Sequence, residues 1–352
     1  MKLFTVGPVE MYSETLEESG LQLPYFRTAE FSELMLESEK MLLELTEAPK
    51  QSRAVFLTAS GTGAMEAAII NCLNNSDFVL TIDGGSFGHR FVQLCEHHKI
   101  PQEVLHLNFG DTLTGEMLES AYRDGMTALL VNLHETSIGQ LYDMDLISAF
   151  CKEHDLLLIV DAISAFLADE IRMEKSGIDV LIMSSQKAFA LAPGISNVVL
   201  SPRALELVEH RGTELMYFDF RDYLKNGERG QTPFTPAVGI LLTLHTRLAG
   251  ICADGLENVR SSIRNLAQDF RDKVAELPVE IPDFPHSNAL TPIYFPAGNA
   301  KAVYETLYEK YDITVTPSGG ALADYLLRVG HIGNLTTEDN DLLLQAMQEI
   351  MS

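Results

Sequence analysis

The chain has 352 residues, 46% of them hydrophobic, which suffices for one large domain plus a smaller one, or for two or three compact units. The 50 acidic residues outnumber the 25 lysines and arginines, and a formal net charge of −25 disfavours nucleic acid and anionic membranes as partners. No apolar run approaches the roughly 18 residues of a membrane-spanning helix, and we expect no signal peptide. The four cysteines are scattered without a CxxC pair, so the sequence predicts reduced thiols, a cytoplasmic location and no metal site.

Short apolar runs alternate with amphipathic segments over the first two hundred residues. We expect strands at residues 54–57, 78–82, 104–107, 128–132, 156–160, 180–183 and 197–200. We expect helices at residues 13–19, 32–45, 65–72, 90–97, 115–123, 146–153 and 203–210, with the rest of residues 1–35 largely irregular. Short strands rich in Val, Ile and Leu, alternating with helices, are typical of a sheet that helices cover on both faces. The sequence therefore predicts an α/β fold with a mixed, mostly parallel sheet.

The pattern changes in the last third of the chain. Residues 216–231 are charged and predicted to be irregular, and helices are expected at 236–248 and 256–276. The second of these helices is long and amphipathic enough to bridge two domains. Beyond it we expect a strand beginning at Val279, strands at 289–295, 313–316 and 325–329, and helices at 300–311 and 337–351. This order predicts a small C-terminal α+β domain.

One lysine follows a strongly apolar run. The residues from Val180 to Met183 are apolar, and Lys187 comes after a few small polar residues. The carboxyl ends of strands are where open α/β sheets bind their ligands. Burial lowers the pKa of a lysine and makes its amine a nucleophile that can form a Schiff base. The alternative is a surface lysine just beyond a strand.

Three further loops follow predicted strands and would meet Lys187 at the same edge of the sheet. Gly61 and Thr62 open a helix, where free amides attract an anion, although the turn could be a plain helix cap. Phe87 could stack on a flat cofactor or belong to the core. Asp161 ends a buried strand and could pair with the pyridinium N–H of pyridoxal phosphate, cap a helix or form a salt bridge. Together the four loops indicate a ligand site more specifically than any one of them does alone.

With these residues in place, the chain resembles the class V aminotransferases, which are fold type I pyridoxal-phosphate enzymes. The resemblance is greatest to the alanine–glyoxylate, serine–pyruvate and 2-aminoethylphosphonate–pyruvate branch. The matching motifs lie at residues 58–68, 85–90, 134–139, 160–164, 184–188, 231–236 and 327–333. The resemblance implies an N-terminal segment near the active site (1–15), a large cofactor-binding domain (16–250) and a small C-terminal domain (251–352).

The resemblance also implies a role for each matching residue. Lys187 would hold pyridoxal 5'-phosphate as a Schiff base and move the substrate's α-proton, while Asp161 would keep the pyridine nitrogen protonated. The other implied cofactor contacts are Gly61, Thr62, Phe87, Thr136, Gln186 and, from the neighbouring subunit of a homodimer, Thr232. The implied substrate contacts are Gly7 and the carboxylate-binding Arg328.

These assignments predict an aminotransferase that moves an amino group from a small amino acid, such as alanine or serine, to a 2-oxo acid such as pyruvate or glyoxylate. A 2-aminoethylphosphonate–pyruvate aminotransferase is an alternative. A lyase of the cysteine desulfurase type is a second one, but it needs a mobile cysteine, and only Cys252 lies between Thr232 and Arg328. A cofactor-free binding protein is a third. A dinucleotide enzyme is disfavoured because no GxGxxG follows a strand.

Overall fold

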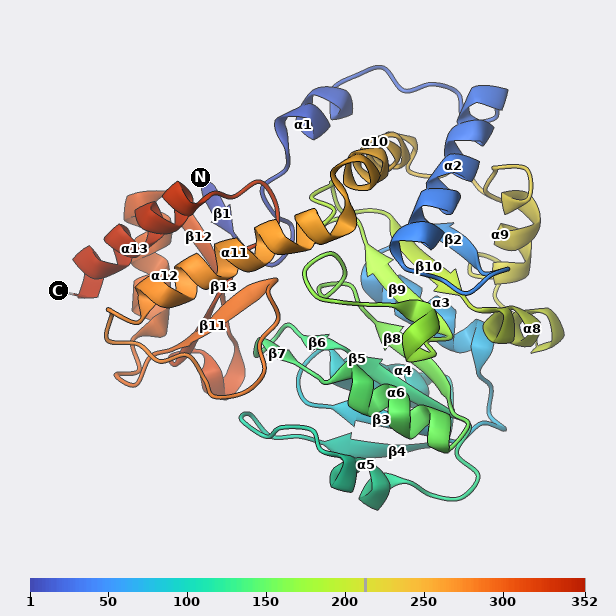
Figure 1. Ribbon diagram of the computed structural model, residues 1–352, viewed down its shortest axis with the longest axis horizontal. Coiled ribbons are helices and arrows are strands. Elements are labelled where there is room, and N and C mark those ends of the chain that lie inside the picture. The colour runs from blue at the N-terminus through green and yellow to red at the C-terminus, as the bar shows by residue number, and fades with distance from the viewer. Residues whose placement is uncertain (212–213, 352) are drawn as a thin grey trace.

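A seven-stranded sheet forms the centre of the larger part of the molecule in the computed structural model, which describes residues 1–211 and 214–351 (Figure 1). The strand order is β2-β10-β9-β8-β5-β3-β4. The strands are β2 (Arg53–Leu57), β3 (Val79–Asp83), β4 (Gln102–His106), β5 (Ala128–Asn132), β8 (Leu157–Asp161), β9 (Val180–Ser184) and β10 (Ser196–Leu200). Strand β10 pairs antiparallel with β2 and β9, and all the other neighbouring strands of this sheet pair in parallel. The predicted mixed, mostly parallel sheet is confirmed.

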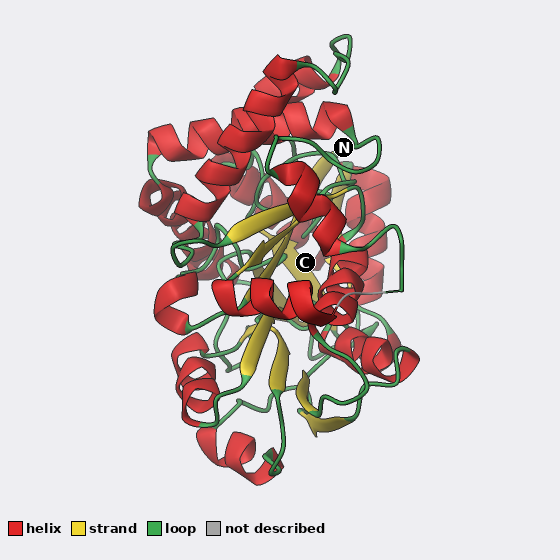
Figure 2. Ribbon diagram, turned by 90° about the vertical axis from the view of Figure 1, so that its right-hand side faces the viewer, coloured by secondary structure: helices red, strands yellow, loops and turns green. Residues whose placement is uncertain are grey.

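Helices cover both faces of this sheet, as Figure 2 shows. Along β5, Leu129 and Val131 enter one core while Ala128 and Leu130 enter the other, because successive side chains of a strand point to opposite faces. The first core holds apolar residues of α2 (Ala29–Leu45), α5 (Gly115–Ala121), α6 (Met144–Glu153), α7 (Met173–Ser176) and α10 (Val238–Asp254). The second holds those of α3 (Gly61–Cys72), α4 (Gly88–His97), α8 (Pro202–Arg211) and α9 (Phe220–Gly227). Double coverage explains why the strands read as continuous apolar runs.

A four-stranded sheet forms the smaller part of the molecule, in the order β1-β12-β13-β11. Its strands are β1 (Lys2–Phe4), β11 (Leu290–Tyr294), β12 (Ile313–Pro317) and β13 (Leu326–Gly330), and the elements around it are α11 (Leu256–Val274), α12 (Ala300–Tyr311), α13 (Thr337–Met351) and the 3-10 turn η1 (Gly320–Leu322). Helix α11 runs from α10 towards this sheet (Figure 1), and Ile263 packs on the large core while Phe270 lies in the small one. The predicted bridging helix is therefore confirmed, whereas the exact domain boundaries stay predictions.

Three expectations about local structure were wrong. Besides the helix α1 (Ser13–Ser19), which was expected, the N-terminal segment contains a strand that was not, because Lys2–Phe4 pairs with β12 far along the chain. Residues 216–231 contain α9, which is capped by Asp219 and buries Phe220 beneath a charged outer face. No strand begins at Val279 among the described residues; Glu280 forms only an isolated bridge with Tyr294. In each case a tertiary partner decided the structure.

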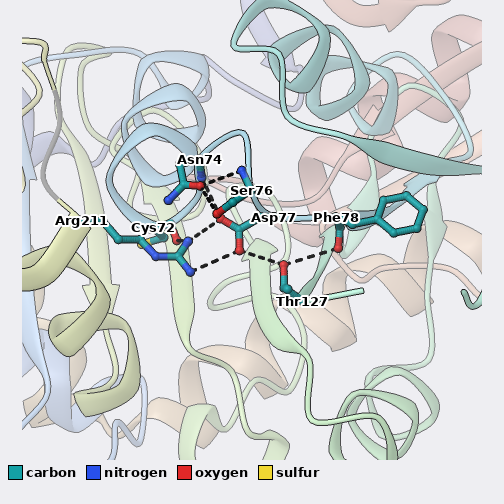
Figure 3. A network of polar contacts seen from close by, with 7 residues as sticks. All are labelled: Cys72, Asn74, Ser76, Asp77, Phe78, Thr127 and Arg211. Carbon is teal, nitrogen blue, oxygen red and sulfur yellow. Dashed lines mark hydrogen bonds and ion pairs between the residues drawn. The ribbon is translucent and has the colours of Figure 1, made fainter. Parts of the chain in front are cut away.

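At the amino edge of the large sheet, the carboxylate of Asp77 links several elements through hydrogen bonds (Figure 3). Asp77 accepts two hydrogen bonds from the guanidinium of Arg211, at the end of α8. It also accepts bonds from Thr127 Oγ1 at 2.9 Å and from the backbone N–H of Asn74 at 2.8 Å. Arg211 donates a further bond to the carbonyl of Cys72. This network joins α3, α8 and the starts of β3 and β5.

All four cysteines are free, with Cys72, Cys95 and Cys151 buried and Cys252 partly buried within α10. Cys252 thus lies in a helix rather than in a mobile loop. Among the described residues, no helix is both long and apolar enough to cross a membrane.

Candidate active site

A cleft of about 580 Å³ lies where the carboxyl edge of the large sheet meets the small sheet. Its walls come from the loops after β3 and β9, the hairpin of β6 (His134–Glu135) and β7 (Gln140–Leu141), the N-terminal segment and the β12–β13 region. The lining residues are Val6, Gly7, Gly85, Ser86, Phe87, Thr136, Ser137, Ile138, Lys187, Thr316, Ser318, Gly319, Leu322 and Arg328. Five of the predicted site residues are therefore brought to one cleft: Gly7, Phe87, Thr136, Lys187 and Arg328.

Lys187 reaches the cleft from the loop after β9. Its Nζ donates a hydrogen bond to the carbonyl of Val6, and desolvation lowers its pKa to about 8 although the charge of Asp161 opposes the shift. Gly7 lies directly against it: a Cβ there would be 2.6 Å from Lys187 Cδ, and φ is +118°. Only glycine meets both conditions without strain. The N-terminal segment thus covers the lysine.

Asp161 ends β8 and is buried beneath the cleft. Its Oδ2 accepts a hydrogen bond from Asn132 Nδ2 at 2.9 Å, and its Oδ1 accepts one from the backbone N–H of Ile163 at 2.9 Å. Burial raises its pKa to about 6, although these hydrogen bonds and Lys187 favour the ionised form. Among the described residues it has no ion-pair partner within 4.0 Å, which argues against a salt-bridge role.

Gly61 and Thr62 stand at the start of α3, beside the loop that follows Asp161. A Cβ at Gly61 would lie 2.4 Å from Ile163 Cδ1, so a larger residue there would have to displace the end of that side chain. The hydroxyl of Thr62 accepts a hydrogen bond from Arg90 Nη1 at 3.1 Å. A helix N-terminus with a guanidinium beside it can bind an anion. Neither residue is among those that line the cleft.

Arg328 faces the cleft from β13. Its Nη1 donates to the carbonyl of Thr136 at 2.8 Å and its Nη2 to that of Pro317 at 2.6 Å, while its buried Nε has no partner among the described residues. Burial lowers its pKa to about 10, so the group stays charged near neutrality. A fixed guanidinium with an unused N–H is suited to binding a carboxylate.

The other two predicted residues have partners of their own. Gln186, next to Lys187, accepts a hydrogen bond from Ser184 Oγ at 2.7 Å. Thr232 does not join the cleft of its own chain: its hydroxyl donates to the carbonyl of Phe234, and its own carbonyl accepts from Arg27. That Thr232 serves the site of a neighbouring subunit stays a prediction.

Two buried residues that the sequence did not single out lie in the hairpin below the cleft. His134 contacts Ser164 Oγ through Nδ1 at 2.9 Å, and desolvation lowers its pKa to about 3. Ser164 Oγ in turn lies 2.7 Å from Thr136 Oγ1. Glu135 is fully buried and accepts hydrogen bonds from the turn that carries Phe87. Neither residue was given a role from the sequence, although both belong to the matching motif at residues 134–139, shortly after a predicted strand.

Comparison with known proteins identifies a family and several relatives of this chain. Residues 11–335 match the family model described as "Aminotransferase class-V". The "Soluble hydrogenase 42 kDa subunit" of Anabaena cylindrica is 31% identical over 89% of this chain and 83% of its own. The "L-aspartate--glyoxylate aminotransferase" of Paracoccus denitrificans (strain Pd 1222) is 30% identical over 95% of this chain and 87% of its own. The solved structure of "Alanine--glyoxylate aminotransferase" from Nostoc sp. superposes with a TM-score of 0.93 and 25% identity, covering 99% of this chain and 95% of that one.

Proposed function

Since the chain belongs to the class-V aminotransferase family and so transfers amino groups between an amino acid and a 2-oxo acid, we propose that it does so with pyridoxal 5'-phosphate held by Lys187. Three side chains of the site support this cofactor. Lys187 offers an amine of lowered pKa, Asp161 a buried carboxylate without a cation, and Phe87 an apolar wall. When bound, pyridoxal phosphate supplies an electron sink for the carbanion that forms at the substrate's α-carbon.

Each remaining residue has a task that its surroundings support. Asp161 would accept the N–H of the pyridine ring, and Gly61, Thr62 and Gln186 would hold the phosphate. Thr136, which lines the cleft, would lie beside the ring. Lys187 would remove and return the α-proton, because its lowered pKa keeps a useful fraction of the amine neutral near pH 7 to 8. The carbonyl of Val6 orients that amine.

Arg328 carries the proposal for the substrate. It lies in the same cleft as Lys187, and its Nη1 and Nη2 each donate one N–H to a backbone carbonyl, so each retains a second N–H for a substrate carboxylate. The other lining side chains are neutral, including the hydroxyls of Ser86, Thr316 and Ser318. A cleft with one guanidinium suits a donor with one carboxylate and a small neutral side chain. We therefore infer alanine or serine as donor, with pyruvate or glyoxylate as acceptor.

A titration of the purified holoprotein tests this proposal. The visible absorbance band of the bound cofactor should bleach on addition of alanine or serine and return on addition of pyruvate or glyoxylate. Aspartate, the donor named for the Paracoccus relative, and 2-aminoethylphosphonate should bleach it at least about tenfold less efficiently, because a second anionic group finds no further cation in the cleft. Preference for either of these two donors would refute the neutral-donor assignment. A protein that cannot be reconstituted with pyridoxal phosphate would refute the cofactor.

A homodimer is the assembly that we propose. Several large apolar side chains are exposed in residues 16–25, namely Leu16, Leu21, Leu23 and Tyr25. The side chain of Met216 is exposed as well. Contiguous exposed apolar side chains of this kind mark interaction surfaces. Light scattering should give twice the 39.0 kDa chain mass, and a mass of one chain would contradict the dimer and the shared role of Thr232. The cytoplasmic location stays a prediction.

A further inference from the structure

The turn that carries Phe87 is hydrogen-bonded to the β6–β7 hairpin. The backbone N–H groups of three consecutive residues donate to the side chains of Glu135, the last residue of β6, and of Ser137 in the loop that follows. Ser86 donates to Ser137 Oγ at 3.1 Å, Phe87 to Glu135 Oε1 at 3.4 Å and Gly88 to Glu135 Oε2 at 2.8 Å. These amides belong to the turn before α4 and to the first residue of that helix, where no earlier helical carbonyl is available. The position of the Phe87 ring therefore depends on Glu135 and Ser137.

Glu135 can hold the turn because its own surroundings consist of donors. Its side chain is 0% exposed and also accepts bonds from the N–H of Ser137 at 3.1 Å and from Ser137 Oγ at 2.5 Å. No lysine, arginine or histidine among the described residues forms an ion pair with it within 4.0 Å. A buried carboxylate without a paired cation is costly, and the hydrogen bonds offset that cost. Such a group is difficult to explain as a packing residue.

The glycines of the turn fit this arrangement. A Cβ on Gly85 would lie 2.6 Å from Glu135 Cδ and 2.5 Å from Ser137 Oγ, and one on Gly88 would lie 2.7 Å from the carbonyl of Ile82. The missing side chain of Gly85 lets the turn approach the carboxylate, and that of Gly88 lets the start of α4 approach the end of β3.

The same hairpin also contacts Arg328. Thr136, between Glu135 and Ser137, accepts the hydrogen bond from Arg328 Nη1 with its backbone carbonyl. Its hydroxyl is fixed in turn by Ser164 Oγ at 2.7 Å. A displacement of Glu135 would therefore move the Phe87 turn and the contact of Arg328 together.

From this geometry we infer that Glu135 is a positioning residue of the active site, which sets the Phe87 ring against the cofactor and, through the adjoining Thr136, sets Arg328 against the substrate carboxylate. This inference rests on the proposed cofactor and substrate sites. Glu135 itself is not proposed to touch the substrate, since the turn lies between its carboxylate and the cleft. Its effect is indirect, and it should alter cofactor binding and donor affinity more than the stability of the chain.

Glu135→Gln tests the inference, because the amide keeps the size but presents an NH₂ to groups that are themselves donors. In the cofactor-free protein, hydrogen–deuterium exchange at residues 86–88 should rise at least about tenfold. In the holoprotein, the visible circular dichroism of the bound cofactor should change, and the dissociation constant of pyridoxal phosphate and the KM for the donor should each rise about tenfold or more. Unchanged exchange together with unchanged dichroism would overturn the inference.

Glu39→Gln is the matched control. Glu39 is also a buried carboxylate, but it pairs with Arg53 Nε at 2.7 Å and accepts from the N–H of Ala54 at 2.9 Å, and it does not line the cleft. Its substitution should lower the melting temperature and leave the cofactor dichroism as in the wild type. If Glu39→Gln altered the dichroism equally, a general loss of stability would explain the Glu135 result and the inference would fail.

Ser137→Ala keeps the inference testable should Glu135→Gln not fold. It removes the acceptor of the Ser86 N–H and one donor to Glu135, so it should shift exchange at residues 86–88 and the dichroism in the same direction, by a smaller amount. No change in this variant would count against the inference. The exchange measurement needs no cofactor, so failure of the proposed function would appear separately, as a wild-type protein without a visible band.

Discussion

Buried carboxylates stand at both edges of the large sheet, but their surroundings differ. At the amino edge, Asp77 is 2% exposed and accepts hydrogen bonds from a guanidinium, a hydroxyl and a backbone amide. At the carboxyl edge, Asp161 is 1% exposed and accepts one bond from Asn132 and one from the Ile163 amide, without an ion pair among the described residues. Both carboxylates are almost completely removed from water, but Asp77 has more hydrogen bonds than Asp161, and a guanidinium, to offset the cost of burying its charge.

The difference shows which buried charges stabilise a fold and which are available to a ligand. A buried carboxylate with a bidentate arginine lowers the free energy of the folded state relative to the same carboxylate unpaired. A buried carboxylate whose pKa is raised to about 6, next to a lysine whose pKa is lowered to about 8, is typical of a functional site. Substitutions at the carboxyl edge should therefore reduce activity, and those at the amino edge should reduce stability.

Lys187→Ala should have the largest effect. Activity should fall by at least about a thousandfold, because the variant loses both the amine that binds the cofactor and the group that moves the proton. The visible absorbance band of the holoprotein should disappear, which a spectrum before and after reconstitution would check. Lys301→Ala, at an exposed position on α12, is the control and should keep both. A Lys187→Ala protein with wild-type turnover would remove this residue from the mechanism.

Asp161→Asn should reduce turnover by about a hundredfold, because a neutral amide no longer stabilises the protonated ring. The same change should raise the stability of the cofactor-free protein. Since the pKa of Asp161 rises from 3.8 in the unfolded chain to about 6 in the folded one, ionisation costs stability as pH increases through that window. The stability gain of the variant should therefore grow between about pH 4 and 6 and stay constant above. Chemical denaturation at several pH values measures it, and a variant less stable than wild type at pH 7 would contradict the prediction.

Arg328→Ala should raise the KM for the amino donor by about ten- to a hundredfold, because a hydrogen bond between two charged groups contributes roughly 1.5–3 kcal/mol. Steady-state kinetics with alanine and serine would check it. The cofactor spectrum should stay as in wild type, since Arg328 is not proposed to contact the cofactor. An unaltered KM would mean that another group binds the substrate carboxylate.

Asp77→Asn should leave turnover unchanged and lower the free energy of unfolding by about 2 kcal/mol, because Arg211 loses its charged partner while the shape is kept. Urea denaturation measures the loss and steady-state kinetics the activity. A large fall in kcat with normal stability would remove the distinction between the two edges.

Much of the fold was predictable from local sequence. The ranges 128–132, 300–311 and 337–351 agree with β5, α12 and α13 residue for residue. The errors fell on β1, on α9 and on the strand expected from Val279. Three residues carry too little periodicity to predict β1, charged residues mask two buried aromatic ones in α9, and Glu280 forms only an isolated bridge. Lys187 was predicted from its place after a strand and Arg328 from the family resemblance, and both line the cleft, whereas Glu135 was missed because the Gly88 amide that it binds lies 47 residues earlier in the chain.

The sequence by itself determined the order of strands and helices and which residues stand at the carboxyl ends of strands, because periodicity and strand ends are written in neighbouring residues. Only the tertiary structure decided that the carbonyl of Val6 meets Lys187, 181 residues away, and that Arg328 bonds the carbonyl of Thr136, 192 residues away. Those contacts exist because the small sheet meets the carboxyl edge of the large sheet at the cleft. No local sequence pattern encodes which residues so far apart in the chain will come into contact. The amine, the guanidinium and the buried carboxylates acquire their shifted pKa values from that packing alone.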